Sequence, residues 1–156
     1  MDIKDYERKV LEMCRDFKTI FIYISKDDEV ETRNIIKYLM FSGKRVVVPL
    51  SNIEKNEIEL SEIGEFELLQ KGAYGIDEPK KRIAVTKEDI EIFFVPGRMF
   101  DEKGNRKGRG KGYFDRFLEK IKGKKRIVGL CYRHQLMNKL ETNEWDIPVD
   151  EIILAD

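Results

Sequence analysis

Glycines and basic side chains alternate through one stretch of the chain, Phe100 to Leu118, which reads FDEKGNRKGRGKGYFDRFL. Its glycines are Gly104, Gly108, Gly110 and Gly112, and its interleaved cations are Arg106, Lys107, Arg109 and Lys111. Glycine lets backbone N–H groups turn toward a ligand without a Cβ in the way, and cations between the glycines neutralise an anion held there. The stretch therefore predicts a binding site for phosphate groups.

The residues on either side of this stretch indicate how it is positioned. Asp89 to Pro96 (DIEIFFVP) has the apolar run of a buried strand, whereas Tyr113, Phe114, Phe117 and Leu118 have the spacing of a helix. Phosphate sites occur in the order strand, glycine-rich loop, helix, because the start of a helix adds unpaired N–H donors. The loop is neither a Walker loop nor a G-x-G-x-x-G loop. A solvated basic hairpin is the alternative interpretation.

Three residues at the start of this helix are candidates for further roles. Asp115, in the first turn, complements the helix dipole or holds a magnesium ion beside bound phosphates. The rings of Tyr113 and Phe114 wall a flat heterocycle or pack into the core, and for Phe114 we expect the core.

The composition suits one globular domain over residues 1–156. Lys plus Arg and Asp plus Glu both number 30, so the net charge is zero and any attraction to nucleic acid or membrane would be local. No apolar run approaches the roughly 20 residues that cross a bilayer, and the amphipathic, charged N-terminus does not resemble a signal peptide, so we expect a cytoplasmic protein. Cys14 and Cys131 have no metal-type spacing with His134, and we expect both to be reduced and structural.

Alternating helix and strand signals predict the fold. We expect three helices: a short one through Tyr6 and Phe17, one capped by Asp27 or Asp28 that ends at 42–43, and one from Tyr113 to about Gly123. We expect strands at 18–25, 44–50, 89–96, 125–132 and 151–154. Crossover connections then give a three-layer α/β/α fold with a mostly parallel, Rossmann-like open sheet.

Two further residues fall at the carboxyl ends of predicted strands, the edge where ligands bind in open α/β sheets. Glu29 lies beyond the strand at 18–25, where it either meets a ligand or complements the dipole of the helix that follows. His134 follows the strand at 125–132, and we interpret it as a hydrogen-bonded structural residue rather than a catalyst.

Several segments, in this order, resemble the 5-formyltetrahydrofolate cyclo-ligase family, also called methenyltetrahydrofolate synthetase. They are SKDDEVET at 25–32, the apolar strand ending in Pro49, GIDEP at 75–79, VPGRMFDEKGNRKGRGKGYFDRFL at 95–118, VGLCYRHQ at 128–135 and WDIPVDEII at 145–153. The glycine block is the specific part, and the shared order makes chance similarity improbable.

The resemblance implies an enzyme that uses ATP and Mg²⁺ to close 5-formyltetrahydrofolate to 5,10-methenyltetrahydrofolate, with release of ADP and phosphate. The γ-phosphoryl of ATP passes to the formyl oxygen, and N10 then attacks the activated carbon. Such a transfer depends on positioning and on neutralising charge at the phosphate oxygens, which a cationic loop and a metal supply.

The resemblance also implies roles for residues of this chain. The ATP phosphates would be wrapped by Arg106, Lys107, Gly108, Arg109, Gly110, Lys111, Gly112, Tyr113 and Phe114, with Arg109 and Lys111 nearest the transferred group. Asp115 and Asp146 would hold magnesium. Glu29 and Ile24 would bind the pterin, and Tyr113 would lie between nucleotide and folate. The partners would be these small molecules, with no nucleic acid or membrane, and the protein would be a monomer or homodimer. Asp115→Ala would cost activity and leave the fold intact.

This chain departs from the family pattern at three places. Members usually begin with an additional helix that carries a Lys-x-x-x-Arg pair reaching ATP; Lys4 and Arg8 have that spacing but lie too close to the first strand to be the same pair. Phe114 stands where many members have a second tyrosine, and Trp145 where a histidine is common. The first of these departures favours, as a second hypothesis, a related nucleotide-binding protein with a different pterin-like substrate. A third is an RNA-binding module that uses the basic loop.

Overall fold

A computed structural model describes residues 2–52, 54–55, 57–64, 69–71, 77–79, 81–108 and 112–156. Its helices are α1 (Asp5–Met13), α2 (Arg33–Phe41) and α3 (Tyr113–Glu119), with 3₁₀ turns η3 (Lys87–Asp89) and η4 (Arg133–Gln135). The main sheet has the strand order β11-β9-β6-β1-β2-β3. Its strands are β1 (Thr19–Ile22), β2 (Arg45–Asn52), β3 (Glu57–Glu62), β6 (Ile92–Val95), β9 (Arg126–Cys131) and β11 (Glu151–Leu154).

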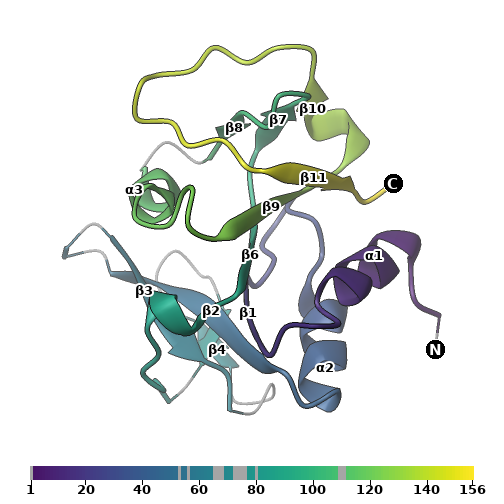
Figure 1. Ribbon diagram of the computed structural model, residues 1–156, viewed down its shortest axis with the longest axis vertical. Coiled ribbons are helices and arrows are strands. Elements are labelled where there is room, and N and C mark those ends of the chain that lie inside the picture. Colours follow the sequence, from purple (N-terminus) through teal and green to yellow (C-terminus); the bar gives the residue numbers. More distant parts are fainter. Residues whose placement is uncertain are drawn as a thin grey trace.

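All neighbours in this sheet pair in parallel except β2 and β3, which are antiparallel. Parallel strands are covered on both faces, and β1 and β6 are accordingly buried at every residue. Successive side chains alternate between the two faces: Ile20 and Ile22 belong to the core cluster with α1 and α2, whereas Phe21 belongs to the cluster with α3. Figure 1 shows α1 and α2 on one side of the sheet and α3 on the other. The predicted three-layer, mostly parallel fold is confirmed.

Two small sheets complete the described structure. One has the order β10-β7-β8 and consists of β7 (Met99–Asp101), β8 (Arg106–Lys107) and β10 (Leu136–Met137). The other is an antiparallel pair, β4 (Leu69–Lys71) with β5 (Asp77–Pro79). The β7–β8 hairpin lies between β6 and α3, where the sequence favoured a glycine-rich loop over a basic hairpin.

Three predicted helix boundaries were wrong. The first helix, expected to run through Phe17, ends at Met13. The helix expected from Asp27 or Asp28 begins at Arg33, because residues 26–31 form a loop tied to the sheet by side chains. Ser25 N donates to Thr32 Oγ1 at 3.0 Å, and Thr32 Oγ1 donates to Tyr23 O at 2.7 Å. The helix expected to reach Gly123 ends at Glu119, and turns follow to Gly123, whose φ of +74° is left-handed. The last strand, Glu151–Leu154, lies where it was predicted.

The strand order also places the ligand edge. From β1 the chain continues to β2 on one side, and it later returns to place β6 on the other side of β1. The connections therefore reverse direction between β1 and β6, and the carboxyl ends of such a pair of strands form a crevice. Tyr23 and Ile24 follow β1 at this point, and Pro96 and Gly97 follow β6.

Candidate active site

A cavity of about 400 Å³ lies at this crevice. Its walls come from the segments after β1 and β6, from β2 and β3, from the β7–β8 hairpin, from the start of α3 and from the segment before β11. The lining residues are Tyr23, Ile24, Lys26, Glu29, Pro49, Ile58, Pro96, Gly97, Arg98, Arg106, Lys107, Gly108, Gly112, Tyr113, Phe114, Asp115, Asn143, Trp145 and Asp146. The cavity thus brings together every predicted site residue that the structure describes. Arg109, Gly110 and Lys111 lie outside the described residues.

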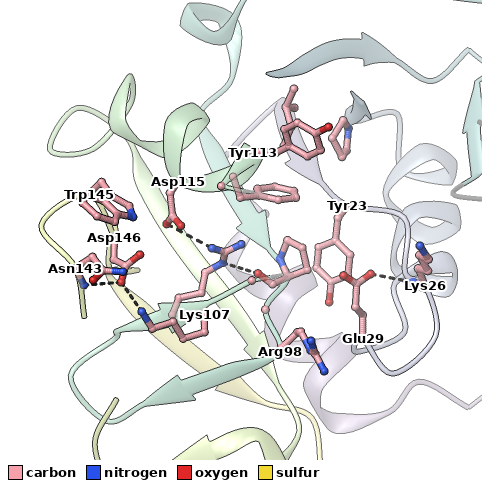
Figure 2. Close-up of a pocket in the computed structure, with 18 of the residues that line it drawn as sticks. Tyr23, Lys26, Glu29, Arg98, Lys107, Tyr113, Asp115, Asn143, Trp145 and Asp146 are labelled. Carbon is pink, nitrogen blue, oxygen red and sulfur yellow. Dashed lines mark hydrogen bonds and ion pairs between the residues drawn. The ribbon is translucent and has the colours of Figure 1, made fainter. Parts of the chain in front are cut away.

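One end of the cavity carries Tyr23 and Glu29, with Lys26 and Arg98 beside them, as Figure 2 shows. Glu29 comes from the loop after β1, and the apolar side chains Ile24, Pro49 and Ile58 also line the cavity. The hydroxyl of Tyr23 donates to Val30 O at 2.8 Å, which fixes the ring, and burial raises the pKa of Tyr23 well above its usual value. Tyr23 is therefore a neutral wall of the cavity.

Glu29 lies in a turn and not at the start of a helix, so the dipole role considered for it was wrong. Its backbone N–H donates to Lys26 O at 2.9 Å, and its Oε1 accepts from Lys26 N at 3.0 Å. The turn directs the carboxylate side chain toward the cavity, as Figure 2 shows. A ligand can meet Glu29 there.

The opposite end of the cavity is charged, and Arg106 forms its floor. Only 3% of this side chain is exposed. Nε donates to Pro96 O at 2.7 Å, and Nη1 lies 3.6 Å from Asp115 Oδ1. Among the residues that the structure describes, buried Nη1 has no hydrogen-bond partner, and the guanidinium lies over the Phe114 ring at 5.3 Å. Burial lowers the pKa of Arg106, whereas the negative charge of Asp115 opposes this shift. The pKa of a guanidinium is far above neutral pH, so Arg106 stays charged.

Lys107 and Asp146 form a second ion pair beside the first. Lys107 Nζ lies 2.6 Å from Asp146 Oδ2, which also accepts from Asn143 N at 2.8 Å. Burial on its own would raise the pKa of Asp146, but these bonds and the charge of Lys107 outweigh it, and the pKa lies below its usual value. Asp146 is therefore an anion at neutral pH.

Asp115 and Asp146 come from distant parts of the sequence and meet at the cavity wall. Asp115 Oδ1 accepts from the backbone N–H of Ile147, the residue next to Asp146, at 3.2 Å. Among the residues that the structure describes, no three His, Cys, Asp or Glu side chains gather as a metal cage. Two carboxylates fit Mg²⁺ nonetheless, because Mg²⁺ keeps several waters and is commonly bound by one or two carboxylates together with substrate phosphates.

Phe114 serves both the core and the cavity. Its ring meets Phe21 edge-on, with centroids 6.5 Å apart, and Phe117 at 6.4 Å, so the expected core packing is confirmed. Tyr113, one residue earlier, also lines the cavity, and the Arg116 guanidinium lies 5.6 Å from the centre of its ring.

The residues after β9 contact the segment after β6 that lines the cavity. Gln135 is buried; its Nε2 donates to Gly97 O at 2.9 Å, and its Oε1 accepts from Tyr132 N at 2.8 Å. His134 stacks on the Tyr132 ring, with centroids 5.6 Å apart, and lines a smaller neighbouring cavity with Arg98. Gln135 therefore fixes the segment that follows β6.

Sequence reasoning missed several lining residues, among them Lys26, Pro49, Ile58, Arg98, Asn143 and Trp145. Arg98 follows the carboxyl end of β6, and Lys26 follows β1, so their place after a buried strand was a usable signal. Lys4 and Arg8 do not line the cavity. Arg8 is exposed and pairs with Asp5. Cys14 and Cys131 are buried and free, as expected.

Within the described part of the chain, none of the helices has the length and apolar character that a membrane span requires. This finding agrees with the absence of a long apolar run in the sequence.

Comparisons with known proteins find the same likeness along nearly the whole chain. The model of the 5-formyltetrahydrofolate cyclo-ligase family matches residues 2–155. The 5-formyltetrahydrofolate cyclo-ligase of Mus musculus is 32% identical over 150 residues, which cover 89% of this chain and 74% of that protein. That of Haemophilus influenzae is 33% identical over 145 residues, with 90% and 78% covered. The NMR structure of Aquifex aeolicus 5,10-methenyltetrahydrofolate synthetase has a TM-score of 0.77 and 32% identity, with 97% of this chain and 79% of that chain covered.

Proposed function

Because this chain belongs to the 5-formyltetrahydrofolate cyclo-ligase family, we propose that it catalyses the ATP-dependent, Mg²⁺-requiring cyclisation of 5-formyltetrahydrofolate to 5,10-methenyltetrahydrofolate. The observation that carries the proposal is the division of one cavity into two ends. Tyr23 and Glu29 lie at one end, and two pairs of cations and carboxylates lie at the other (Figure 2). A reaction between a flat heterocycle and a polyphosphate needs both.

The pterin occupies the end with Glu29. A pterin ring presents adjacent N–H donors, and a carboxylate is an acceptor that matches them. Ile24 and Tyr23 pack against the faces of the ring, and Pro49 and Ile58 exclude water from it. Tyr113 lies between the pterin and the nucleotide.

The ATP phosphates occupy the end with Arg106 and Lys107. The backbone of Gly108 and Gly112 borders this end, and we assign the intervening Arg109, Gly110 and Lys111 to the phosphates as well, with Arg109 and Lys111 nearest the transferred group. The ring of Phe114 packs against the Arg106 guanidinium of this loop. These cations neutralise the negative charge of the phosphate oxygens, which is the main demand of phosphoryl transfer.

Asp115 and Asp146 would hold the magnesium ion, which when bound neutralises the charge of the phosphates. Each carboxylate is already paired with a cation, Arg106 or Lys107. These cations would turn from the carboxylates to the phosphates when the ligand arrives.

The reaction proceeds in two displacements. The formyl oxygen attacks the γ-phosphorus; an O–P bond forms, the bond to the bridging oxygen breaks, and ADP leaves. N10 then attacks the formyl carbon and loses its proton, and the C–O bond breaks to release phosphate. N10 and the formyl group belong to the same folate, so the second step is intramolecular, and a cavity that holds the folate in the reactive conformation lowers its entropic cost.

The two alternative functions, a different pterin-like substrate and RNA binding, make different demands on the loop cations. A related enzyme with another pterin-like substrate would use the same cavity and the same phosphate end. An RNA-binding module would need the loop cations on the surface, but Arg106 is 3% exposed and Lys107 is held by Asp146. The described cations of the loop therefore favour a small anionic ligand.

Purified protein incubated with ATP, Mg²⁺ and 5-formyltetrahydrofolate tests the proposal. We expect methenyl absorbance to appear in a one-to-one ratio with ADP, and no product without ATP. ATP binding together with failure to convert 5-formyltetrahydrofolate would support the alternative substrate instead. Salt-sensitive RNA binding that Arg109→Ala with Lys111→Ala abolishes, in a protein that binds no nucleotide, would support the third hypothesis.

A further inference from the structure

Trp145 is exposed although it is the largest aromatic side chain of the cavity wall. Its exposed fraction is 63%, and among the described residues only Phe41 and Met99 are other large hydrophobic side chains with high exposure. Neither of those two lines this cavity, whereas Trp145 does. An exposed indole beside a polar site offers a flat apolar face to a ligand.

The backbone on both sides of Trp145 is anchored, so the ring has a defined place. Asp146 N donates to Asn143 O at 3.1 Å and closes a turn. Asp146 Oδ2 accepts from Lys107 Nζ at 2.6 Å, and Ile147 N donates to Asp115 Oδ1 at 3.2 Å. These bonds place the indole directly next to the charged end of the cavity.

The reaction itself restricts which part of the ligand reaches Trp145. The γ-phosphoryl of ATP has to meet the formyl group between the two ends of the cavity, so the base must point away from the pterin. Figure 2 shows Trp145, Asn143 and Asp146 on the side opposite Glu29 and Tyr23, with Asp115 between. The base therefore leaves the phosphate end on the side of Trp145.

We infer that the indole of Trp145 stacks on the purine base of bound ATP and makes this site prefer a nucleoside triphosphate to inorganic tripolyphosphate. The inference rests on the proposed function, because it takes ATP as the ligand of the phosphate end. Stacking of a base on an aromatic side chain contributes enough that removing the ring should weaken binding about 5- to 100-fold. The phosphate contacts of Arg106 and Lys107 do not depend on the ring.

Trp145 is the single tryptophan of the chain, so intrinsic fluorescence reports on it alone. We expect MgATP to quench this fluorescence and magnesium tripolyphosphate to bind with little change. By calorimetry, Trp145→Ala should bind MgATP about 5- to 100-fold more weakly and tripolyphosphate with unchanged affinity, while Trp145→Phe should stay within about 3-fold of the parent for both. Phe41→Ala, which removes an exposed aromatic ring at the end of α2, is the matched control and should alter neither affinity.

Four results would overturn the inference. Trp145→Ala could weaken ATP and tripolyphosphate equally or leave ATP binding unchanged, which would exclude a contact with the base. Folate alone could quench the indole while ATP does not, which would assign the ring to the folate. Absence of any ATP binding would overturn the inference together with the nucleotide part of the proposed function. Base-dependent ATP binding without methenyl formation would support the stacking and contradict only the proposed reaction.

Discussion

Lys107 Nζ and Asp146 Oδ2 lie 2.6 Å apart, although 39 residues separate them in the sequence. The pair joins the β7–β8 hairpin to the segment before β11 and closes the charged end of the cavity. Lys107 is 29% exposed and Asp146 9%, so the pair is partly shielded from water. A ligand that brings phosphates and a divalent cation would satisfy both partners separately. We therefore expect this ion pair to open when MgATP binds.

Asp146→Asn should separate metal binding from phosphate binding. The amide is a poor ligand for Mg²⁺, so we expect Mg²⁺-dependent turnover to fall by about 100-fold or more. Lys107 loses its carboxylate partner and becomes available, so ATP should bind several-fold more tightly without metal. Calorimetric titration of ATP in the presence of a chelator measures this directly.

Glu144→Gln is the matched control, because Glu144 is an exposed carboxylate two residues away in the same segment. It removes the same charge and should change neither metal-free affinity nor turnover. Weaker metal-free ATP binding by Asp146→Asn than by Glu144→Gln would contradict the opening of the ion pair.

Asp115→Ala should destabilise the protein as well as inactivate it. Arg106 is 3% exposed and pairs with Asp115, so the substitution leaves a buried cation without its anion. Removing one partner of a buried pair costs about 3–5 kcal/mol. Urea denaturation should show a loss of this order, in place of the intact fold that the sequence alone had indicated.

The double variant Arg106→Leu with Asp115→Leu provides the internal control for that loss. It removes both charges, so it should be more stable than Asp115→Ala while remaining inactive. Full stability of Asp115→Ala would show that the ion pair contributes little to the fold.

Gly104→Ala should destabilise the β7–β8 hairpin and the segment that packs on it. Gly104 has φ +86°, and a Cβ there would lie 2.4 Å from Val149 O. We expect a cost of about 2–4 kcal/mol, since a left-handed residue with a side chain costs about 1–2 kcal/mol and the clash adds to it.

Gly123→Ala separates these two effects. Gly123 has φ +74°, but a Cβ there has nothing within 4 Å. The cost should therefore be the conformational part alone, about 1–2 kcal/mol. Equal thermal shifts for the two variants would contradict the close approach of Gly104 to Val149.

The carboxylate of Asp101 should make the protein less stable in acid than at neutral pH. Burial on its own would raise its pKa, but hydrogen bonds from the Asn105 side chain and from the backbone of Leu140, Asn105 and Lys103 outweigh it, so the folded pKa is lowered. A lowered folded pKa contributes stability above the unfolded value of about 3.9, and this contribution is lost as the pH falls through the folded pKa.

Asp101→Asn tests this dependence. It should be about 1–3 kcal/mol less stable at pH 7, because its amide cannot accept all of these bonds. The difference from the parent should shrink as the pH falls below about 4. Urea denaturation at pH 7, 4 and 3 measures it, and a constant difference would exclude Asp101 as the source.

The sequence predicted the layers and the position of the candidate phosphate loop, because both depend on local patterns. Buried β1 and β6 have continuous apolar runs, and the interleaved glycines and cations that end at Tyr113 point to a phosphate loop. Glu29 was within reach because it follows the carboxyl end of a predicted strand, whereas Ile24 and Asp146 came only from the resemblance to the family.

What the sequence could not predict depends on contacts between distant segments. Whether Arg106 faces solvent or is buried is decided by Pro96 O and Asp115, which only the fold brings to it. The start of α2 at Arg33 follows from the bonds between Ser25 and Thr32, which compete with the helix that the apolar spacing favours. Trp145 belongs to a segment without regular structure, where periodicity gives no orientation.

Transfer of the formyl oxygen to phosphate is the most direct test of the whole account. 5-Formyltetrahydrofolate labelled with ¹⁸O in its formyl group is converted by the protein with MgATP, and the released phosphate is analysed by mass spectrometry. If the charged end of the cavity delivers the γ-phosphoryl to the formyl oxygen, each released phosphate carries the label. Unlabelled phosphate accompanying methenyl product would contradict the transfer, and absence of both products would contradict the assigned function.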